Sequence, residues 1–158
     1  LAMSVAVTLQ DYLDSNDFQY ELVDHLPKKL NQKDPETGVI TGDRVAKPVL
    51  LGDDDSYLLA VLPASHRLDL DRLNSAMARS LLIMNQNELE ATFHDCERNA
   101  VPPTGELYGV DTIVDPSLFH KEEVFFESGD IKQMIKMTGD EFKRLMQDAE
   151  VHTISHHL

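Results

Sequence analysis

The pattern of apolar and polar positions predicts alternating short helices and strands along the first half of the chain. A short amphipathic helix follows Thr8, whose side chain can cap it, and residues 18–23 alternate as a strand. The clearest signal is a pair of apolar segments at 45–51 and 57–62. The polar segment 52–56 joins them and has the composition of a tight turn, which predicts a β-hairpin.

Two helices with recognisable start signals follow this hairpin. Asp69 can cap the first, and Asn85 opens a capping-box-like sequence that starts the second, which runs through Phe93. Between the helices, the apolar residues 81–84 predict a short buried strand. Ahead of the hairpin, residues 27–42 are polar and contain proline and glycine, so they predict a long loop.

The second half of the chain continues the same mixture. Strands are predicted at 111–114, 123–127 and 131–137, followed by a helix that the capping box at Thr138 opens. A last strand is predicted near Val151. About seven strands and four helices in mixed order predict an α+β domain with a mixed sheet rather than a doubly wound parallel one.

Length and composition are those of one globular domain, which we expect to span residues 1–158. Leu1-Ala2 precedes Met3 and is interpreted as a cloning remnant. No apolar run approaches the ~20 residues of a membrane-spanning helix, and the start lacks the basic region of a signal peptide. A single cysteine, Cys96, excludes an internal disulfide framework and agrees with a reducing compartment. We therefore expect a cytoplasmic protein without a membrane partner.

Charge argues against a protein that grips long nucleic acids. The chain has 14 Lys and Arg residues against 28 Asp and Glu residues, a formal net charge of −14. A long duplex is held by a broad basic surface, so we expect no DNA partner. Basic residues gather only locally, as Lys28, Lys29 and Lys33 and again as Arg44 and Lys47. These groups allow contact with a nucleic-acid end, and a solvated mixed surface is the alternative.

Lys47 is the first residue that points to chemistry. It lies inside an apolar strand, between Ala46 and Pro48. A lysine in such a strand must either extend its charged end to solvent or meet an anion. An ordinary surface lysine at a strand edge is therefore the alternative to a functional one.

The segment 99–109 is too rigid to be an ordinary linker. Pro102-Pro103 fixes two φ angles, and Gly105 permits a backbone conformation closed to other residues. A rigid backbone of this kind can present the N–H groups of Ala100 and Val101 to a substrate carbonyl. A plain structural turn is the alternative.

Other polar clusters give weaker signals. Cys96 lies two residues after His94 without a third catalytic partner nearby, which favours an ordinary, partly buried thiol. The acidic run 53–55 lacks the spaced ligands of a calcium loop and is interpreted as a solvated turn. The C-terminal histidines predict a tail rather than a zinc site. Nucleotide-binding and zinc-protease motifs are also absent from the sequence, so we predict no metal and no cofactor.

Two long segments carry a family resemblance. They are RVAKPVLLGDDDSYLLAVLPASHRLDLDRL, which starts at Arg44, and NELEATFHDCERNAVPPTGELYGVDTIVDPSLF, which starts at Asn87. Both resemble the YbaK/prolyl-tRNA-synthetase-associated domain family, and the similarity covers roughly residues 9–151. The resemblance implies an α+β fold with a mixed, partly barrel-like β-sheet surrounded by helices. It also implies an aminoacyl-tRNA deacylase that removes the amino acid from the 3′ end of mischarged tRNA.

The resemblance transfers unevenly to individual residues. Lys47 matches the family's essential lysine, which implies a catalytic role. The polar residue that commonly follows this lysine is replaced by Pro48, which has no side-chain donor.

The family's G-x-x-x-P-x-G loop falls on residues 99–105. Pro103 and Gly105 match, whereas Asn99 replaces the first glycine, and asparagine tolerates positive φ better than most residues. Ser128-Gly129 resembles the small-residue segment that lines the family's pocket. The substrate-binding residues that the resemblance implies are Asn99, Ala100, Val101, Pro103, Gly105, Ser128 and Gly129.

The chemistry asks little of the protein, because an aminoacyl ester is already activated. Hydrolysis needs positioning, water and stabilisation of a developing oxyanion, and the sequence shows no convincing general base. The attacking group stays open between water and the substrate's own hydroxyl or thiol. The expected partner is the aminoacyl-tRNA 3′ end, with an aminoacyl-tRNA synthetase or another tRNA-binding protein supplying affinity. Two rivals stay open: a catalytically weakened ligand- or tRNA-binding module of a larger regulatory protein, and a metal-dependent hydrolase that uses the histidines.

Overall fold

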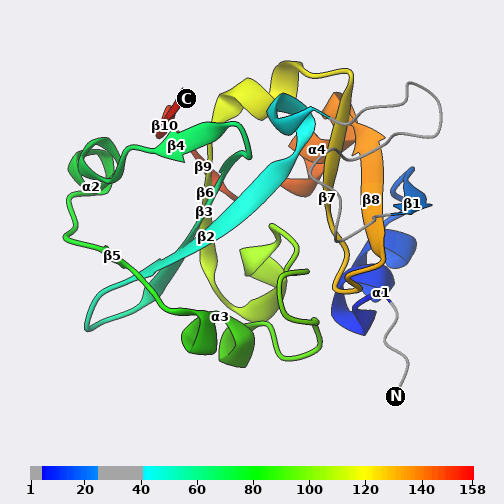
Figure 1. Ribbon diagram of the computed structural model, residues 1–158, viewed down its shortest axis with the longest axis horizontal. Helices are drawn as coiled ribbons and strands as arrows, with labels where there is room; N and C mark the ends of the chain where they lie inside the picture. The colour runs from blue at the N-terminus through cyan, green and yellow to red at the C-terminus, as the bar shows by residue number, and fades with distance from the viewer. Residues whose placement is uncertain (1–4, 25–40) are drawn as a thin grey trace.

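The computed structural model describes residues 5–24 and 41–158 of the chain (Figure 1). Its α-helices are α1 (Val7–Ser15), α2 (Leu70–Met77), α3 (Gln86–Thr92) and α4 (Gly139–Leu145). Its strands are β1 (Glu21–Asp24), β2 (Ala46–Gly52), β3 (Tyr57–Pro63), β4 (His66–Leu68), β5 (Leu82–Ile83), β6 (Asp111–Val114), β7 (Glu123–Glu127), β8 (Gln133–Thr138), β9 (Glu150–Val151) and β10 (Ser155–His157). Three short 3₁₀ segments complete it: η1 (Gly42–Arg44), η2 (Gly105–Tyr108) and η3 (Pro116–His120).

The largest sheet has five strands in the order β5-β2-β3-β6-β9 and is mixed. β2 and β3 form the expected antiparallel hairpin, in which Lys47 lies opposite Leu62. β6 runs parallel to β3, and β9 runs parallel to β6. The predicted mixed sheet and the α+β class are therefore confirmed.

A second, antiparallel sheet of three strands, β1-β8-β7, lies beside α1 on the right of Figure 1. One isolated parallel bridge, between Val45 and Phe125, connects it to the five-stranded sheet. Within the described residues the two sheets form no closed barrel. Residues of β2 and β7 line a common cavity where these two sheets approach each other.

The central strand β3 of this sheet is buried on both faces, which explains why it is almost continuously apolar. Side chains alternate between the faces of a strand, so Leu58 and Ala60 belong to one buried cluster and Leu59 and Val61 to the other. The first cluster is covered by α2 through Leu73. The second is larger and includes the buried faces of α1, α4 and the three-stranded sheet.

Three of the expected helix caps are confirmed. The side chains of Asp69, Asn85 and Thr138 accept hydrogen bonds from backbone N–H groups in the first turns of α2, α3 and α4. The predicted cap of α1 is wrong, because this helix starts at Val7 after Ala6. Thr8 instead lies inside the helix, and its N–H donates to Asp95 Oδ2 at 3.0 Å.

Three other expectations need correction. The strand expected at 18–23 begins only at Glu21, because Phe18 packs into the core directly after α1. The expected buried strand at 81–84 is a short edge strand whose Leu82 and Ile83 are exposed. The C-terminal histidines are no tail, since β10 pairs antiparallel with β4. Residues 27–40 of the predicted loop, which include its lysines, lie outside the described residues, and so do Leu1 and Ala2.

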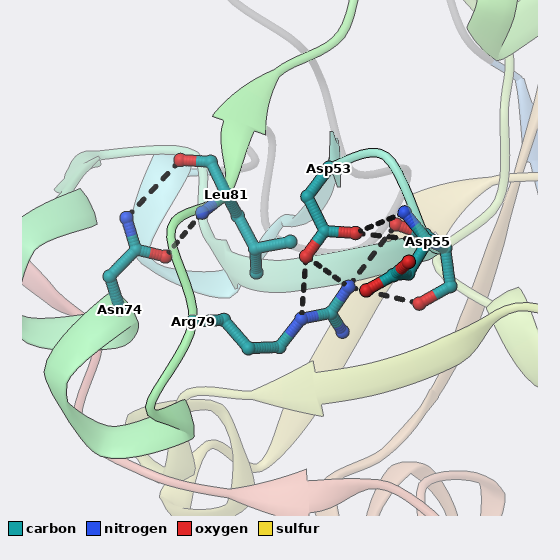
Figure 2. A network of polar contacts seen from close by, with 6 residues as sticks. Asp53, Asp55, Asn74, Arg79 and Leu81 are labelled. Atoms are coloured by element: carbon teal, nitrogen blue, oxygen red, sulfur yellow. Dashed lines mark hydrogen bonds and ion pairs between the residues drawn. The ribbon is translucent and has the colours of Figure 1, made fainter.

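The acidic turn between β2 and β3 is braced by its own backbone and by one arginine (Figure 2). Asp53 Oδ1 accepts the N–H groups of Asp55 and Ser56, at 2.9 and 3.0 Å. The guanidinium of Arg79 reaches Asp53 Oδ2 at 3.0 Å and the Ser56 oxygens. Beside it, the Asn74 side chain both donates to and accepts from the backbone of Leu81. The turn is therefore a polar brace whose side chains pair with one another and with the backbone.

In the described part of the chain, no helix has the length and apolar character needed to cross a bilayer. No group of His, Cys, Asp and Glu side chains in that part is arranged to hold a metal ion either.

Candidate functional site

A cavity of about 320 Å³ opens where β2, α3, the loop after α3 and the end of β7 come together. We call it the Lys47 cavity. Its walls combine apolar side chains with a small number of polar groups, as is typical of small-molecule sites. The lining residues are Val45, Ala46, Lys47, Pro48, Gln86, Leu89, Asn99, Val101 and Glu127.

Lys47 supplies the positive charge of this cavity. Its Nζ donates to the carbonyl oxygen of His66 at 3.0 Å, its one hydrogen bond within the described residues. An ammonium group has three N–H donors, so two are left for a ligand. Burial lowers the pKa of Lys47, because desolvation disfavours the charged form. Lys47 is therefore half-buried at the cavity wall, with its ammonium group on a backbone carbonyl.

The loop at 99–101 forms the opposite wall. Asn99 has φ +66°, so the residue that replaces the family glycine does adopt the left-handed conformation. The Ala100 N–H donates to the carbonyl of Glu97 at 3.1 Å, so the structure corrects the expectation that it faces a substrate. The Val101 N–H has no hydrogen-bond partner among the described residues, and Val101 lines the cavity. Val101 thus keeps the donor expected of this loop.

The other expected loop residues do not line the Lys47 cavity. Pro103 lines a separate cavity. Gly105 is buried, and a Cβ placed there would lie 2.6 Å from Thr112 Oγ1 and 2.8 Å from the Val110 carbonyl. No other residue fits that space, so Gly105 shapes the loop without contacting the cavity.

Ser128 and Gly129 follow Glu127 in the chain and lie outside the lining of the Lys47 cavity. Ser128 is fully buried, and its hydroxyl donates to the Gln133 carbonyl at 2.7 Å. Gly129 has φ +96° and packs against Ala6, and its N–H donates to the Ala100 carbonyl at 2.8 Å. Gly129 thus contacts the 99–101 loop through the Ala100 carbonyl, and Ser128 bonds within the turn 128–133.

Glu127, which sequence reasoning missed, is the acidic group of the cavity. It ends β7 directly before Ser128, and burial raises its pKa to about 8. No ion pair joins it to Lys47 within the described residues. Its position next to the small-residue segment was the available signal, but an acidic residue at a strand end is usually solvated.

Gln86, at the start of α3, is the second residue that sequence reasoning missed. Its Nε2 atom is buried and has no hydrogen-bond partner in the part of the chain that the structure describes. A buried amide without a partner is unusual in a folded protein. Because Gln86 lines the cavity, a ligand bound there can accept this hydrogen bond.

Cys96 can be set aside as a nucleophile. Burial raises the pKa of its thiol to about 12, so the reactive thiolate is scarce near neutral pH. Its sulfur lies 3.5 Å from the Tyr108 hydroxyl, which donates to Asp95 Oδ1 at 2.6 Å. This cluster ties α1 to the segment after α3 through the N–H of Thr8. The expectation of an ordinary, partly buried thiol is therefore confirmed.

The described polar groups of the Lys47 cavity form a coherent set. Lys47 can contact an anion, Val101 N–H and Gln86 Nε2 can donate to a carbonyl, and Glu127 can exchange a proton near neutral pH. The remaining walls are apolar. Such an arrangement suits a small polar ester with a short side chain.

Sequence comparison places this site in a family. The model of the aminoacyl-tRNA editing domain matches residues 31–145, and the chain belongs to that family. The match includes Lys47, the loop after α3 and Glu127. The resemblance to YbaK-type domains is thereby confirmed. The comparison with curated proteins finds no match.

Solved structures show the same fold at low sequence identity. A candidate trans-editing enzyme for prolyl-tRNA synthetase superimposes with a TM-score of 0.79 at 19% identity, covering 96% of both chains. A candidate signal transduction protein from Marinobacter aquaeolei VT8 gives a TM-score of 0.75 at 23% identity. That comparison covers 96% of the chain, which spans only 31% of the length of the Marinobacter protein.

Proposed function

We propose that the protein is an aminoacyl-tRNA deacylase that hydrolyses the ester of mischarged tRNA in the Lys47 cavity. The observation that carries this proposal is the convergence of Lys47, the Val101 N–H and Glu127 on one cavity of about 320 Å³. Membership of the editing-domain family supports it.

In this proposal, Lys47 binds the terminal phosphate or the ester region of the tRNA 3′ end. Its two remaining N–H donors and its position on the rigid hairpin suit it to that task. The ester carbonyl faces the Val101 N–H, which stabilises the oxyanion that forms as water attacks. Gln86 Nε2 offers a further donor to the same region.

Glu127 serves as the general base. Its carboxylate takes a proton from water as the water oxygen bonds to the carbonyl carbon. When the tetrahedral intermediate collapses, the ester C–O bond breaks and the ribose hydroxyl takes that proton. A base works best when its pKa lies near the working pH, and burial brings the pKa of Glu127 to about 8.

The amino acid side chain contacts the apolar wall formed by Val45, Ala46, Pro48 and Leu89. Selection then depends on size, and a hydrophobic pocket separates side chains by only about 1–3 kcal/mol per methylene. A wall of this kind favours small apolar side chains. Discrimination this weak in any single step is the physical reason for editing as a second step.

Affinity for tRNA has to come partly from elsewhere. The net charge of −14 opposes broad contact with the phosphate backbone. We therefore include in the proposal a tRNA-binding partner, such as an aminoacyl-tRNA synthetase. Measured at moderate salt, tRNA binding should require that partner.

The test is a deacylation assay with tRNAs mischarged with alanine, serine, cysteine or threonine. We expect at least one ester to be hydrolysed well above the uncatalysed rate, and we expect a chelator to have no effect. If every ester decays at the uncatalysed rate with and without a synthetase, the proposal is wrong. Loss of activity with the chelator would instead support the metal-dependent rival.

A binding module without turnover is the second candidate, and one observation favours it. The Marinobacter protein with the same fold is about three times as long and is described as a candidate signal transduction protein. The fold therefore also occurs as one part of a longer chain. A pure binder would retain aminoacyl-tRNA in a binding assay and leave the ester intact. The deacylation assay therefore separates the two candidates.

A further inference from the structure

A second cavity, of about 290 Å³, lies at the other end of the loop that borders the Lys47 cavity. We call it the Thr104 cavity. It shares no lining residue with the first cavity, although one loop contributes Asn99 and Val101 to the first and Pro103 and Thr104 to the second. The lining residues are Tyr12, Pro103, Thr104, Glu106, Leu107, Thr112, Leu145, Met146 and Asp148.

The inner walls of the Thr104 cavity are apolar. Leu145 and Met146, from the end of α4, are buried, and Tyr12 and Leu107 are half-buried. A volume of this size accommodates the apolar body of a small organic molecule. The cavity thus has room and a hydrophobic surface for a ligand.

The Thr104 hydroxyl is the most informative polar atom here. Thr104 is only 4% exposed, and its Oγ1 atom has no hydrogen-bond partner in the described part of the chain. Buried hydroxyl groups nearly always have a partner, because leaving one unpaired costs free energy. A ligand with a polar group can supply that partner.

The charged groups of the cavity are both acidic. Glu106 and Asp148 line it, and Lys, Arg and His are absent from the described lining residues. Glu106 Oε1 accepts the Thr112 N–H at 3.1 Å, which fixes the carboxyl group in place. Burial raises the pKa of Glu106, and the negative charges of Asp111 and Asp148 raise it further. A cation bound beside these carboxylates would relieve this repulsion.

We propose that the Thr104 cavity is a binding site for a small organic amine, separate from the editing site. Its ammonium group lies against the carboxylates of Glu106 and Asp148, its apolar body contacts Leu145 and Met146, and a polar group on that body pairs with the Thr104 hydroxyl. The proposal stands whether or not the Lys47 cavity has deacylase activity.

Calorimetric titration with three matched probes tests this assignment. Tyramine has the ammonium, the apolar ring and a hydroxyl; phenethylamine lacks the hydroxyl, and tyrosol replaces the ammonium by an alcohol. We expect tyramine to bind with a dissociation constant on the order of 1 mM, and each of the other two to bind about tenfold more weakly. Binding of tyrosol as tight as that of tyramine, or no binding of tyramine, would overturn the proposal.

Two variants assign the probe contacts to residues. Glu106→Gln keeps an oxygen for the Thr112 N–H and should weaken tyramine about tenfold, to the level of tyrosol. Thr104→Val keeps the side-chain shape and should make tyramine and phenethylamine bind alike. Asp71→Asn, on α2 outside the cavity, changes the net charge equally and should leave all three affinities unchanged. Unchanged tyramine affinity in both cavity variants, with thermal unfolding showing folded proteins, would also overturn the proposal.

Discussion

The brace at the β2–β3 turn and the Lys47 cavity are built from the same hairpin but differ in how their polar groups are paired. In the brace, Asp53, Arg79 and Asn74 make mutual or backbone hydrogen bonds (Figure 2). In the cavity, the amide of Gln86 and the N–H of Val101 find no partner among the described residues.

This difference in pairing separates a polar cluster that stabilises the fold from one whose donors are available to a ligand. A network whose hydrogen bonds are all made stabilises one conformation. Unpaired buried donors lower the stability of the fold and are therefore expected mainly at binding sites. By sequence alone the acidic run is already interpreted as a solvated turn and Lys47 as a candidate for chemistry, and in the structure the pairing of the polar groups separates the two regions. Five predictions test this distinction.

Lys47→Met should have the largest effect. The variant keeps the apolar stem and removes the charge, so we expect deacylation to fall about 10³-fold while thermal unfolding is little changed. Single-turnover deacylation of the best mischarged tRNA is the measurement. Lys143→Met, on the exposed face of α4, is the matched control and should keep full activity. Full activity of Lys47→Met would remove the lysine from the mechanism.

Glu127→Gln should lower the deacylation rate about 10²-fold and change its pH dependence. In the unmodified protein the enzymatic rate should rise with pH through about 8, as the carboxyl group ionises, and the variant should lack this rise. Glu150→Gln, on the exposed edge strand β9, is the control. An identical pH profile in Glu127→Gln would show that another group accepts the proton, without bearing on whether the protein is a deacylase.

The raised pKa of Glu127 also predicts a stability effect that needs no substrate. A carboxyl group whose folded pKa lies above its unfolded value contributes stability at low pH, and this contribution is lost as the pH rises from about 4.5 to about 8. Denaturant unfolding should therefore show Glu127→Gln gaining stability relative to the unmodified protein over that range.

Asn74→Ala should affect the fold and spare the chemistry. It removes both hydrogen bonds to the Leu81 backbone, and we expect a loss of about 1–3 kcal/mol in the free energy of unfolding. Denaturant unfolding measures the loss, and the deacylation rate should stay unchanged below the transition. A strong loss of activity in a folded Asn74→Ala protein would contradict the distinction, because it would show that the brace also affects the chemistry of the Lys47 cavity.

Asp53→Asn should have the smallest effect, visible as a pH dependence of stability. Hydrogen bonds from Ser56 and Asp55, and the contact with Arg79, hold the pKa of Asp53 below its usual value. Its stabilising contribution is thus present above the ordinary carboxyl pKa and is lost as the pH falls through the lowered one. Unfolding curves of variant and unmodified protein should differ at neutral pH and converge in acid. Parallel curves at every pH would show that the ionised carboxylate does not contribute to the brace.

Much of the architecture could be predicted from local patterns. The β2–β3 hairpin, three helix caps and the strands β6 and β7 follow from alternation, turn composition and capping residues within a few positions of one another. The wrong predictions concern elements whose structure depends on contacts between residues far apart in the sequence. β10 forms because it pairs with β4, some ninety residues earlier in the chain, and no local pattern at the C-terminal histidines announces that pairing.

The site could be predicted only in part, for the same reason. Lys47 and Asn99 were found because motif position marks them, and the structure places both at one cavity. Glu127 was missed because its pKa depends on burial by segments far away in sequence. The role of the Ala100 N–H was misjudged because its partner, the Glu97 carbonyl, is a detail of backbone geometry.

The single bridge between Val45 and Phe125 has a consequence for selectivity. Val45 directly precedes β2, which carries Lys47, and Glu127 ends β7, so the packing of these two strands around the bridge sets the spacing between the lysine and glutamate walls of the cavity. In the proposed deacylase, substitutions that repack the buried side chain of Phe125 would therefore change the spacing of these two walls and, with it, the size of the amino-acid side chain that fits.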